Sequence, residues 1–313
     1  MIYPSKNVVV PDVKPVVFHR VGNCERVKCQ FKYPPNCTKP TISQYKYDFS
    51  KKTRTKSRRP INYCNHKNAF HIYRYDSPSH VKEFLETGTM AFIRPSKWTD
   101  KFERLFYKPH IEIGQNNYDI VCLCFKYDWI VGEEAAWERY GEKTPPVRVE
   151  FNFQTIVNIL NNYAVNNCID FYISIIDYSL RRSQIIKLYQ DKKEFDTIEE
   201  YLTYLSIKRD AFSHENEIRV FAVSEGEPFE ELSNGVIKFE LLPKNGENVS
   251  PHKLLHYVAE DNDDNGKALI TEITLPPKEE SYNEINNLIE TIKRIAPSFT
   301  MNSSKLYNTS FNV

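Results

Sequence analysis

Short apolar runs rich in β-branched and aromatic residues, separated by polar turns, make up most of the chain after residue 68. Runs of this kind predict strands. Helices are expected where capping residues mark their ends. Ser77 and Pro78, for example, predict the start of a helix, and Gly88 predicts its end. The pattern predicts strands at 69–75, 89–93, 120–125, 147–151, 171–178, 218–223, 236–241 and 269–275, and helices at 78–86, 133–140, 154–163, 282–295 and as a pair within 180–207.

This order of elements predicts an α+β fold. Strands are scattered between helices without regular strand–helix–strand alternation, so we expect mixed or antiparallel sheets with flanking helices. A chain of 313 residues can form one large domain with an extension. Residues 1–67 alternate short β-like pieces with prolines, and we interpret them as a basic, β-rich N-terminal extension. Residues 68–313 are the predicted catalytic-like domain.

Charge is unevenly divided between these two parts. Residues 1–67 hold 15 Lys and Arg against 3 Asp and Glu, a net charge of +12, whereas the whole chain carries only +1. The remainder is therefore acidic, at −11. Residues 45–63 combine a basic run with Tyr and Phe, residue types that neutralise phosphates and stack on unpaired bases. They are a predicted RNA or DNA contact; the alternative is a solvated loop without a ligand.

The chain contains no apolar run of transmembrane length and no secretory leader, so we expect a cytoplasmic protein that does not enter a membrane. Its seven cysteines are odd in number and irregularly spaced, and are expected to be thiols in that compartment. Four of them could hold zinc, although no C-x-x-C pair is present. These four are Cys24, Cys29, Cys37 and Cys64.

One stretch concentrates the candidate chemistry, residues 208–223, KRDAFSHENEIRVFAV. Its end predicts a strand, on which residues two apart share a face. Glu215 and Glu217 would then lie side by side, with Arg219 next along the same face. Adjacent carboxylates perturb each other's pKa, as an acid/base or cation-stabilising pair requires. The alternative is an edge strand whose solvent face carries an ordinary ion pair.

Six short motifs, taken in order over about 68–296, resemble a large bacterial family known only as domain of unknown function 2971. Each motif is weakly specific alone, and their order carries the resemblance. Relative to the family pattern, Thr99 stands in place of Asn, Lys101 in place of Pro and Lys126 in place of Ser. The motifs are Tyr73-Arg74-Tyr75, Thr99-Asp100-Lys101-Phe102-Glu103, Cys124-Phe125-Lys126, Ala136-Trp137-Glu138-Arg139-Tyr140, the segment from Lys208 to Arg219, and a strand, turn and helix from Ile270 to Ile295.

The same order is similar to an ADP-ribosyltransferase core. That resemblance implies that Arg74 or His71, with Tyr75, holds NAD as a substrate. It also implies that the Glu215-x-Glu217 pair serves the cationic ribose, because a fixed carboxylate stabilises the positive charge that develops there. The implied protein is a toxin or phage-defence effector that modifies RNA, DNA or protein and has an antitoxin or chaperone partner.

Two residues of the loop before the third strand join this candidate site. Trp98 is either a lid over the nucleotide or a loop anchor, and Asp100 either caps the following turn or faces the bound nucleotide. Trp137 is expected in the core, Cys124 as an inert buried thiol, and His214 at the surface.

Two other functions fit the residues. A non-catalytic module could bind nucleic acid or protein through the basic extension. A metal-dependent nuclease could place four carboxylates around a divalent ion. Turnover of NAD, or a requirement for metal, separates the three hypotheses. The nuclease carboxylates would be Asp100, Glu103, Glu215 and Glu217.

Overall fold

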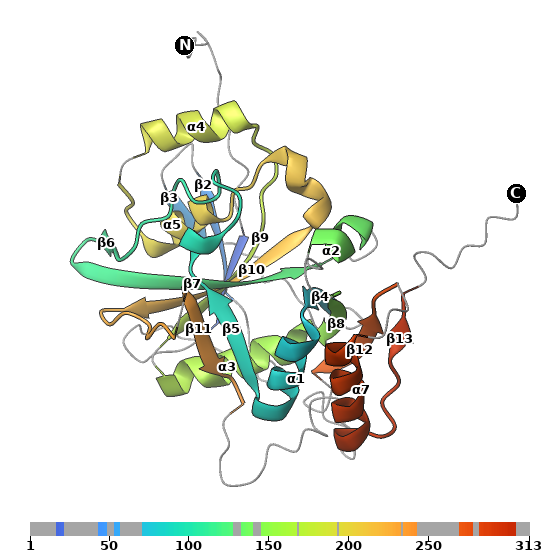
Figure 1. Cartoon of the computed structure of the whole chain (residues 1–313). Coiled ribbons are helices and arrows are strands. Elements are labelled where there is room, and N and C mark those ends of the chain that lie inside the picture. Colours follow the sequence, from blue (N-terminus) through green and yellow to red (C-terminus); the bar gives the residue numbers. More distant parts are fainter. Residues whose placement is uncertain are drawn as a thin grey trace, which may run out of the picture. The chain divides into compact units, whose positions relative to one another are not determined.

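The computed structural model describes eleven segments of the chain (Figure 1). They form two compact units. The first contains the described parts of Met1–Tyr63, Ala91–Cys124 and Ala164–Ile237, and the second those of Cys64–Met90, Phe125–Tyr163 and Lys238–Val313. The segments are 17–21, 43–48, 53–56, 71–127, 133–139, 145–167, 169–192, 194–232, 234–242, 269–277 and 282–304.

The first unit is organised on strand β10 (Glu217–Glu225), which lies between β7 (Asn116–Lys126) and β9 (Asp170–Ile175). β10 and β9 pair antiparallel, with Val220 opposite Ile173. An internal strand is covered on both sides, and this explains why its first seven residues are all buried. The alternative of an edge strand with a solvated Glu-Glu-Arg face is therefore wrong.

Three N-terminal strands continue this sheet. β1 (Val17–Val21) pairs antiparallel with β9, β2 (Ser43–Asp48) with β1, and β3 (Thr53–Lys56) with β2. All three lie within the predicted N-terminal extension. The domain boundary at residue 67 stays a prediction. The proposed zinc ligands lie outside the described residues.

Helices α4 (Arg182–Asp191) and α5 (Ile198–Leu205) belong to the first unit and supply its aromatic core. Phe106 meets Tyr204 edge to face at 5.0 Å between ring centroids, and Phe195 meets Tyr201 at 4.8 Å. Such pairs each add about 0.5–1.5 kcal/mol beyond their buried area. The abundant aromatic residues thus build a core that anchors the loop of residues 98–107.

The second unit contains a mixed sheet. β4 (His71–Asp76) pairs antiparallel with β8 (Val147–Asn152), which pairs antiparallel with β12 (Ile270–Leu275). β13 (Asn302–Ser303) lies parallel to β12. This confirms the α+β class with a mixed sheet. The remaining elements of the two units are β5 (Thr89–Ile93), β6 (Ile111–Ile113), β11 (Val236–Glu240), α2 (Glu133–Arg139), α3 (Phe153–Asn167), and the 3-10 turns η2 (Pro95–Lys97) and η3 (Asp210–Glu215).

Helices α1 (Pro78–Thr87) and α7 (Asn283–Ile295) pack against each other in the second unit. The Ser77 hydroxyl accepts the backbone N–H of His80 at 3.2 Å, and Gly88 ends α1 in the left-handed conformation. Both predicted end signals are confirmed. α7 buries Ile285, Leu288, Ile292 and Ile295 along one face.

Most predicted elements are confirmed within a few residues of their ends. β6, β13 and η3 are not predicted, because they are too short to leave a periodic signal. Within the described segments, no helix has both the length and the apolar character needed to span a bilayer.

Replacing Gly88 with alanine should lower the free energy of unfolding by roughly 2–6 kcal/mol. Its φ of +70° strains any L side chain, at about 1–3 kcal/mol. The added Cβ would also meet the Cβ of Leu242 at 2.7 Å, and overpacking costs about 1–3 kcal/mol more. Gly114→Ala is the control, because Gly114 has a similar φ of +66° and open space around it. Urea unfolding should show the larger destabilisation for Gly88→Ala; equal destabilisation would contradict the packing argument.

Candidate functional site

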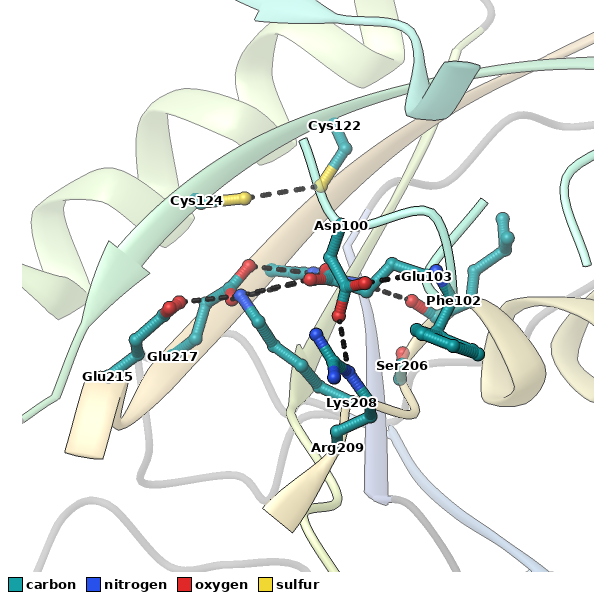
Figure 2. Close-up of polar contacts among 12 residues, drawn as sticks. Asp100, Phe102, Glu103, Cys122, Cys124, Ser206, Lys208, Arg209, Glu215 and Glu217 are labelled. Atoms are coloured by element: carbon teal, nitrogen blue, oxygen red, sulfur yellow. Dashed lines mark hydrogen bonds and ion pairs between the residues drawn. The ribbon is translucent and has the colours of Figure 1, made fainter. Parts of the chain in front are cut away.

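Glu215 and Glu217 are brought together by a change of backbone direction, not by strand alternation. Glu215 ends η3, Asn216 adopts a left-handed conformation with φ of 45°, and Glu217 begins β10. The prediction that both glutamates share one strand face is therefore wrong in its geometry. Their side chains still converge, because both contact the Lys208 ammonium group (Figure 2). Lys208 Nζ lies 2.5 Å from Glu215 Oε2 and 3.0 Å from Glu217 Oε2.

Arg219 is the centre of the site and is only 1% exposed. Its Nε donates to Glu217 Oε1 at 2.7 Å, so these two residues share a face of β10 as predicted. One terminal nitrogen donates to Glu103, and the other donates to the carbonyl of Leu205 at 2.5 Å. The Trp98 ring lies 3.9 Å from the guanidinium carbon. Trp98 thus anchors the loop beneath a buried cation.

Glu103 completes what we call the glutamate cluster, defined as Glu103, Lys208, Glu215, Glu217 and Arg219. Glu103 Oε1 lies 3.2 Å from Lys208 Nζ, while Oε2 accepts from Arg219. Lys208 therefore contacts all three carboxylates. The cluster joins a loop, a 3-10 turn and the start of β10.

Asp100 fills the capping role proposed for it and also pairs with a cation. Its Oδ1 accepts the backbone N–H of Phe102 at 3.0 Å and so caps the turn that presents Glu103. Its Oδ2 accepts from Arg209 Nε at 3.0 Å (Figure 2). Because Arg209 follows Lys208, this pair fixes the loop to the same backbone segment as the cluster.

Two buried glutamates of the cluster have pKa values pushed in opposite directions. Burial would raise the pKa of Glu217, but Arg219 and Lys208 outweigh it, and the pKa is well below its usual value. Burial dominates at Glu103, and its pKa is raised despite Arg219 and Lys208. The Lys208 pKa is raised because Glu217 and Glu103 outweigh the opposing effect of burial. One carboxylate is thus held ionised, and its neighbour retains a proton more readily.

The carboxylates proposed for a nuclease contact protein cations in this structure. Asp100 pairs with Arg209, and the three glutamates of the cluster pair with Lys208 or Arg219. In the described part of the chain, no three His, Cys, Asp or Glu side chains are placed to hold a metal ion. These carboxylates are therefore arranged to form ion pairs with Lys and Arg side chains.

The predicted NAD-binding residues of β4 belong to the second unit. Arg74 Nε contacts Asp76 Oδ2 at 2.6 Å, and His71 pairs with Glu150. Tyr75 is buried, with its ring edge-on to Trp137 at 4.9 Å, which confirms Trp137 as a core residue. Convergence of these residues on Glu217 stays a prediction.

The Cys124 side chain is half-buried, although the sequence predicts a buried one, and His214 lies at the surface as predicted. The Cys124 thiol has a pKa well above its usual value, because of its contact with Cys122 and because of burial. It is therefore a poor nucleophile at neutral pH. His214 is exposed, and its ring lies 6.5 Å from that of Phe212.

Residues 136–220 match the family model described as a protein of unknown function, DUF2971. The match confirms the family resemblance over these residues, which include Trp137 and the segment from Lys208 to Arg219. The other four motifs lie outside the matched residues. No curated protein and no solved structure matches the chain.

Removing the charge of Glu217 should make the protein unfold more easily. Glu217→Gln leaves Arg219 and Lys208 short of a buried partner, which typically costs about 3–5 kcal/mol. Glu86→Gln is the control, because it removes the partner of Arg294, which is 67% exposed, and should cost less than about 1 kcal/mol. Chemical denaturation of both variants tests this, and similarly small effects would show that the cluster contributes little to stability.

The stability difference between wild type and Glu217→Gln should narrow in acid. The folded pKa of Glu217 is below its unfolded value of about 4.3, so its contribution is complete above that pH and is lost as pH falls. Glu103, with its raised pKa, acts in the opposite sense: its contribution is lost as pH rises through its folded pKa. Melting temperatures from pH 7 to pH 3 measure the gap, and a constant gap would contradict the assigned direction for Glu217.

Proposed function

We propose that this relative of the DUF2971 family is an NAD-consuming ADP-ribosyltransferase that modifies a nucleic-acid acceptor. The observation that carries the proposal is Glu217, an ionised and buried carboxylate fixed at the start of a central strand. Cleavage of the nicotinamide–ribose bond develops positive charge on the sugar. A preorganised negative charge in a water-poor site lowers the energy of that transition state.

The reaction assigns separate tasks to Glu217 and Glu215. The glycosidic C–N bond breaks, its electron pair leaves with nicotinamide, and the ribose becomes cationic beside Glu217. A hydroxyl or amine of the acceptor then attacks the ribose carbon, and Glu215 takes the proton it releases. Glu215 suits that task because it is less buried than Glu217. Lys208 joins the two carboxylates and acts as a positioning residue.

Glu217 is held in one orientation by its ion pairs and by the Cys124 thiol. Its Oε1 accepts from Arg219 Nε, and its Oε2 accepts from Lys208 and, at 3.4 Å, from a terminal nitrogen of Arg219. A carboxylate offers about four acceptor directions. The two cations and the Cys124 thiol occupy these directions and preorganise the charge, so Glu217 would act on the sugar through its electric field and not through a further hydrogen bond.

The acceptor is inferred from charge. Residues 45–63 carry a basic run with aromatic residues, and β2 and β3, which include parts of it, belong to the same unit as Glu217. A positive, aromatic segment suits the phosphates and bases of single-stranded RNA or DNA. The proposed role is a cytoplasmic toxin or phage-defence effector whose activity a partner protein restrains.

Glu217→Gln should reduce ADP-ribosyl transfer by roughly a hundredfold or more, because it deletes one electrostatic stabiliser of the transition state. NAD affinity should change less, since the ground-state sugar carries no such charge. Glu215→Gln should impair transfer more than NAD hydrolysis. The assay follows labelled NAD with RNA, DNA and protein acceptors, with and without EDTA, below the melting temperature of each variant.

Glu86→Gln again provides the control and should keep full activity. Turnover that survives EDTA and is abolished in folded Glu217→Gln supports the transferase. Wild-type protein that leaves NAD intact with every acceptor, or undiminished transfer in Glu217→Gln, would reject it. A metal-dependent cleavage of nucleic acid would favour the nuclease.

Removing part of the positive charge of residues 45–63 should weaken nucleic-acid binding. It should also make that binding less dependent on salt concentration. We expect the quadruple Gln variant of Lys51, Lys52, Arg58 and Arg59 to lower the salt slope by about 0.7 for each phosphate of a single strand that the segment no longer neutralises. This variant is preferable to a truncation, because removing β1 would uncover its partner strand β9. Affinity for an RNA oligonucleotide across a salt series is the measurement; an unchanged slope would remove this segment from recognition.

A further inference from the structure

A second cluster in the first unit is cationic and lies beside the glutamates. The guanidinium carbons of Arg209 and Arg182 lie 4.7 Å and 4.9 Å from the centroid of the Phe102 ring, and Lys101 Nζ lies 5.8 Å from it. We call Lys101, Phe102, Arg182 and Arg209 the arginine cluster. It brings residues from a loop, the start of α4 and the chain before η3 onto one aromatic ring.

These cations carry more positive charge than the protein neutralises locally. Arg209 uses its Nε for Asp100, and its terminal nitrogens have no hydrogen-bond partner among the described residues. In the same part of the chain, neither Arg182 nor Lys101 has a carboxylate partner, and both are exposed. Like charges gathered on one ring repel, and a bound anion would remove that cost. Guanidinium groups also match phosphate oxygens in a bidentate geometry.

The arginine cluster is adjacent to the glutamate cluster, and this position indicates which kind of ligand fits both. Arg209 directly follows Lys208, whose ammonium contacts Glu215 and Glu217, and Phe102 directly precedes Glu103 (Figure 2). The Phe212 ring lies 4.8 Å from the Arg209 guanidinium and 5.2 Å from Lys208 Nζ, so it provides an aromatic group between the two clusters.

We infer that the arginine cluster binds the diphosphate of a dinucleotide whose ribose is presented to the glutamate cluster. The guanidinium carbons lie 4.7 Å and 4.9 Å from one ring centroid, and a ligand with two linked phosphates offers one phosphate to each guanidinium group. This inference rests on the proposed function for the identity of the sugar chemistry, and it assigns the diphosphate of NAD to Arg182 and Arg209 and not to Arg74. Arg74 instead pairs closely with Asp76.

Calorimetric titration with inorganic pyrophosphate and with ADP-ribose tests the inference without any need for turnover. Arg182→Gln should weaken both by about tenfold or more, because removing one charge-assisted hydrogen bond has that effect. Arg182→Gln is the simpler variant to interpret. Arg182 forms no ion pair with the described residues, so its replacement removes no ion pair that stabilises the fold. Arg209→Gln should weaken both ligands similarly, and Arg182→Lys should recover part of the affinity by restoring charge. Arg294→Gln, an exposed arginine of the other unit, is the matched control.

The outcomes separate this inference from the proposed function. Binding that disappears in Arg182→Gln, in a protein that never consumes NAD, would support the diphosphate site and reject the transferase. NAD turnover with unchanged ADP-ribose affinity in both arginine variants would overturn the diphosphate site alone. Weaker RNA binding with unchanged ADP-ribose affinity in Arg182→Gln would show a nucleic-acid surface and would also overturn it.

Discussion

The buried guanidinium of Arg219 is the constraint on which the first unit depends. A cation removed from water costs several kcal/mol unless charge and hydrogen bonds compensate for it. Arg219 finds that compensation in Glu217, Glu103, the Leu205 carbonyl and the Trp98 ring. These partners come from separate stretches of the chain, so satisfying one side chain fixes β10, the loop before β6 and the end of α5 together.

The same ion pairs also shift the pKa values of the buried glutamates. Three carboxylates and two cations in a dry environment cannot all keep their solution properties, and the pKa values of Glu217 and Glu103 move apart as a result. Separated pKa values are what acid/base and cation-stabilising sites require. The same carboxylate therefore serves stability and the proposed reaction.

The ion pairs around Lys208 and Arg219 give a physical reason for two of the sequence motifs. The segment from Lys208 to Arg219 lies inside the matched family region, and the loop that carries Asp100 and Glu103 lies outside it. In the structure the two segments form one set of ion pairs. The ion pairs thus explain the spacing of these residues in the sequence. Glu215 and Glu217 both contact Lys208, and Glu217 also contacts Arg219.

Local signals in the sequence determined much of the fold. Ser77, Pro78 and Gly88 bound α1 because capping and the left-handed conformation act within a few residues. Apolar runs located the strands, and the pairing of Glu217 with Arg219 followed from the two-residue repeat of β10. These features depend on near neighbours, so one sequence is enough to predict them.

Only the tertiary structure decided that β10 is an internal strand, that Glu217 and Arg219 are buried, and that Glu103 and Lys208 belong with them. Strand order depends on pairing between distant segments, such as β9 with β10, which leaves no local pattern. The convergence of Glu215 on Glu217 likewise required the left-handed Asn216, which a strand pattern cannot reveal. A charge–charge contact between residues more than a hundred positions apart, as between Glu103 and Arg219, exists only once the chain has folded.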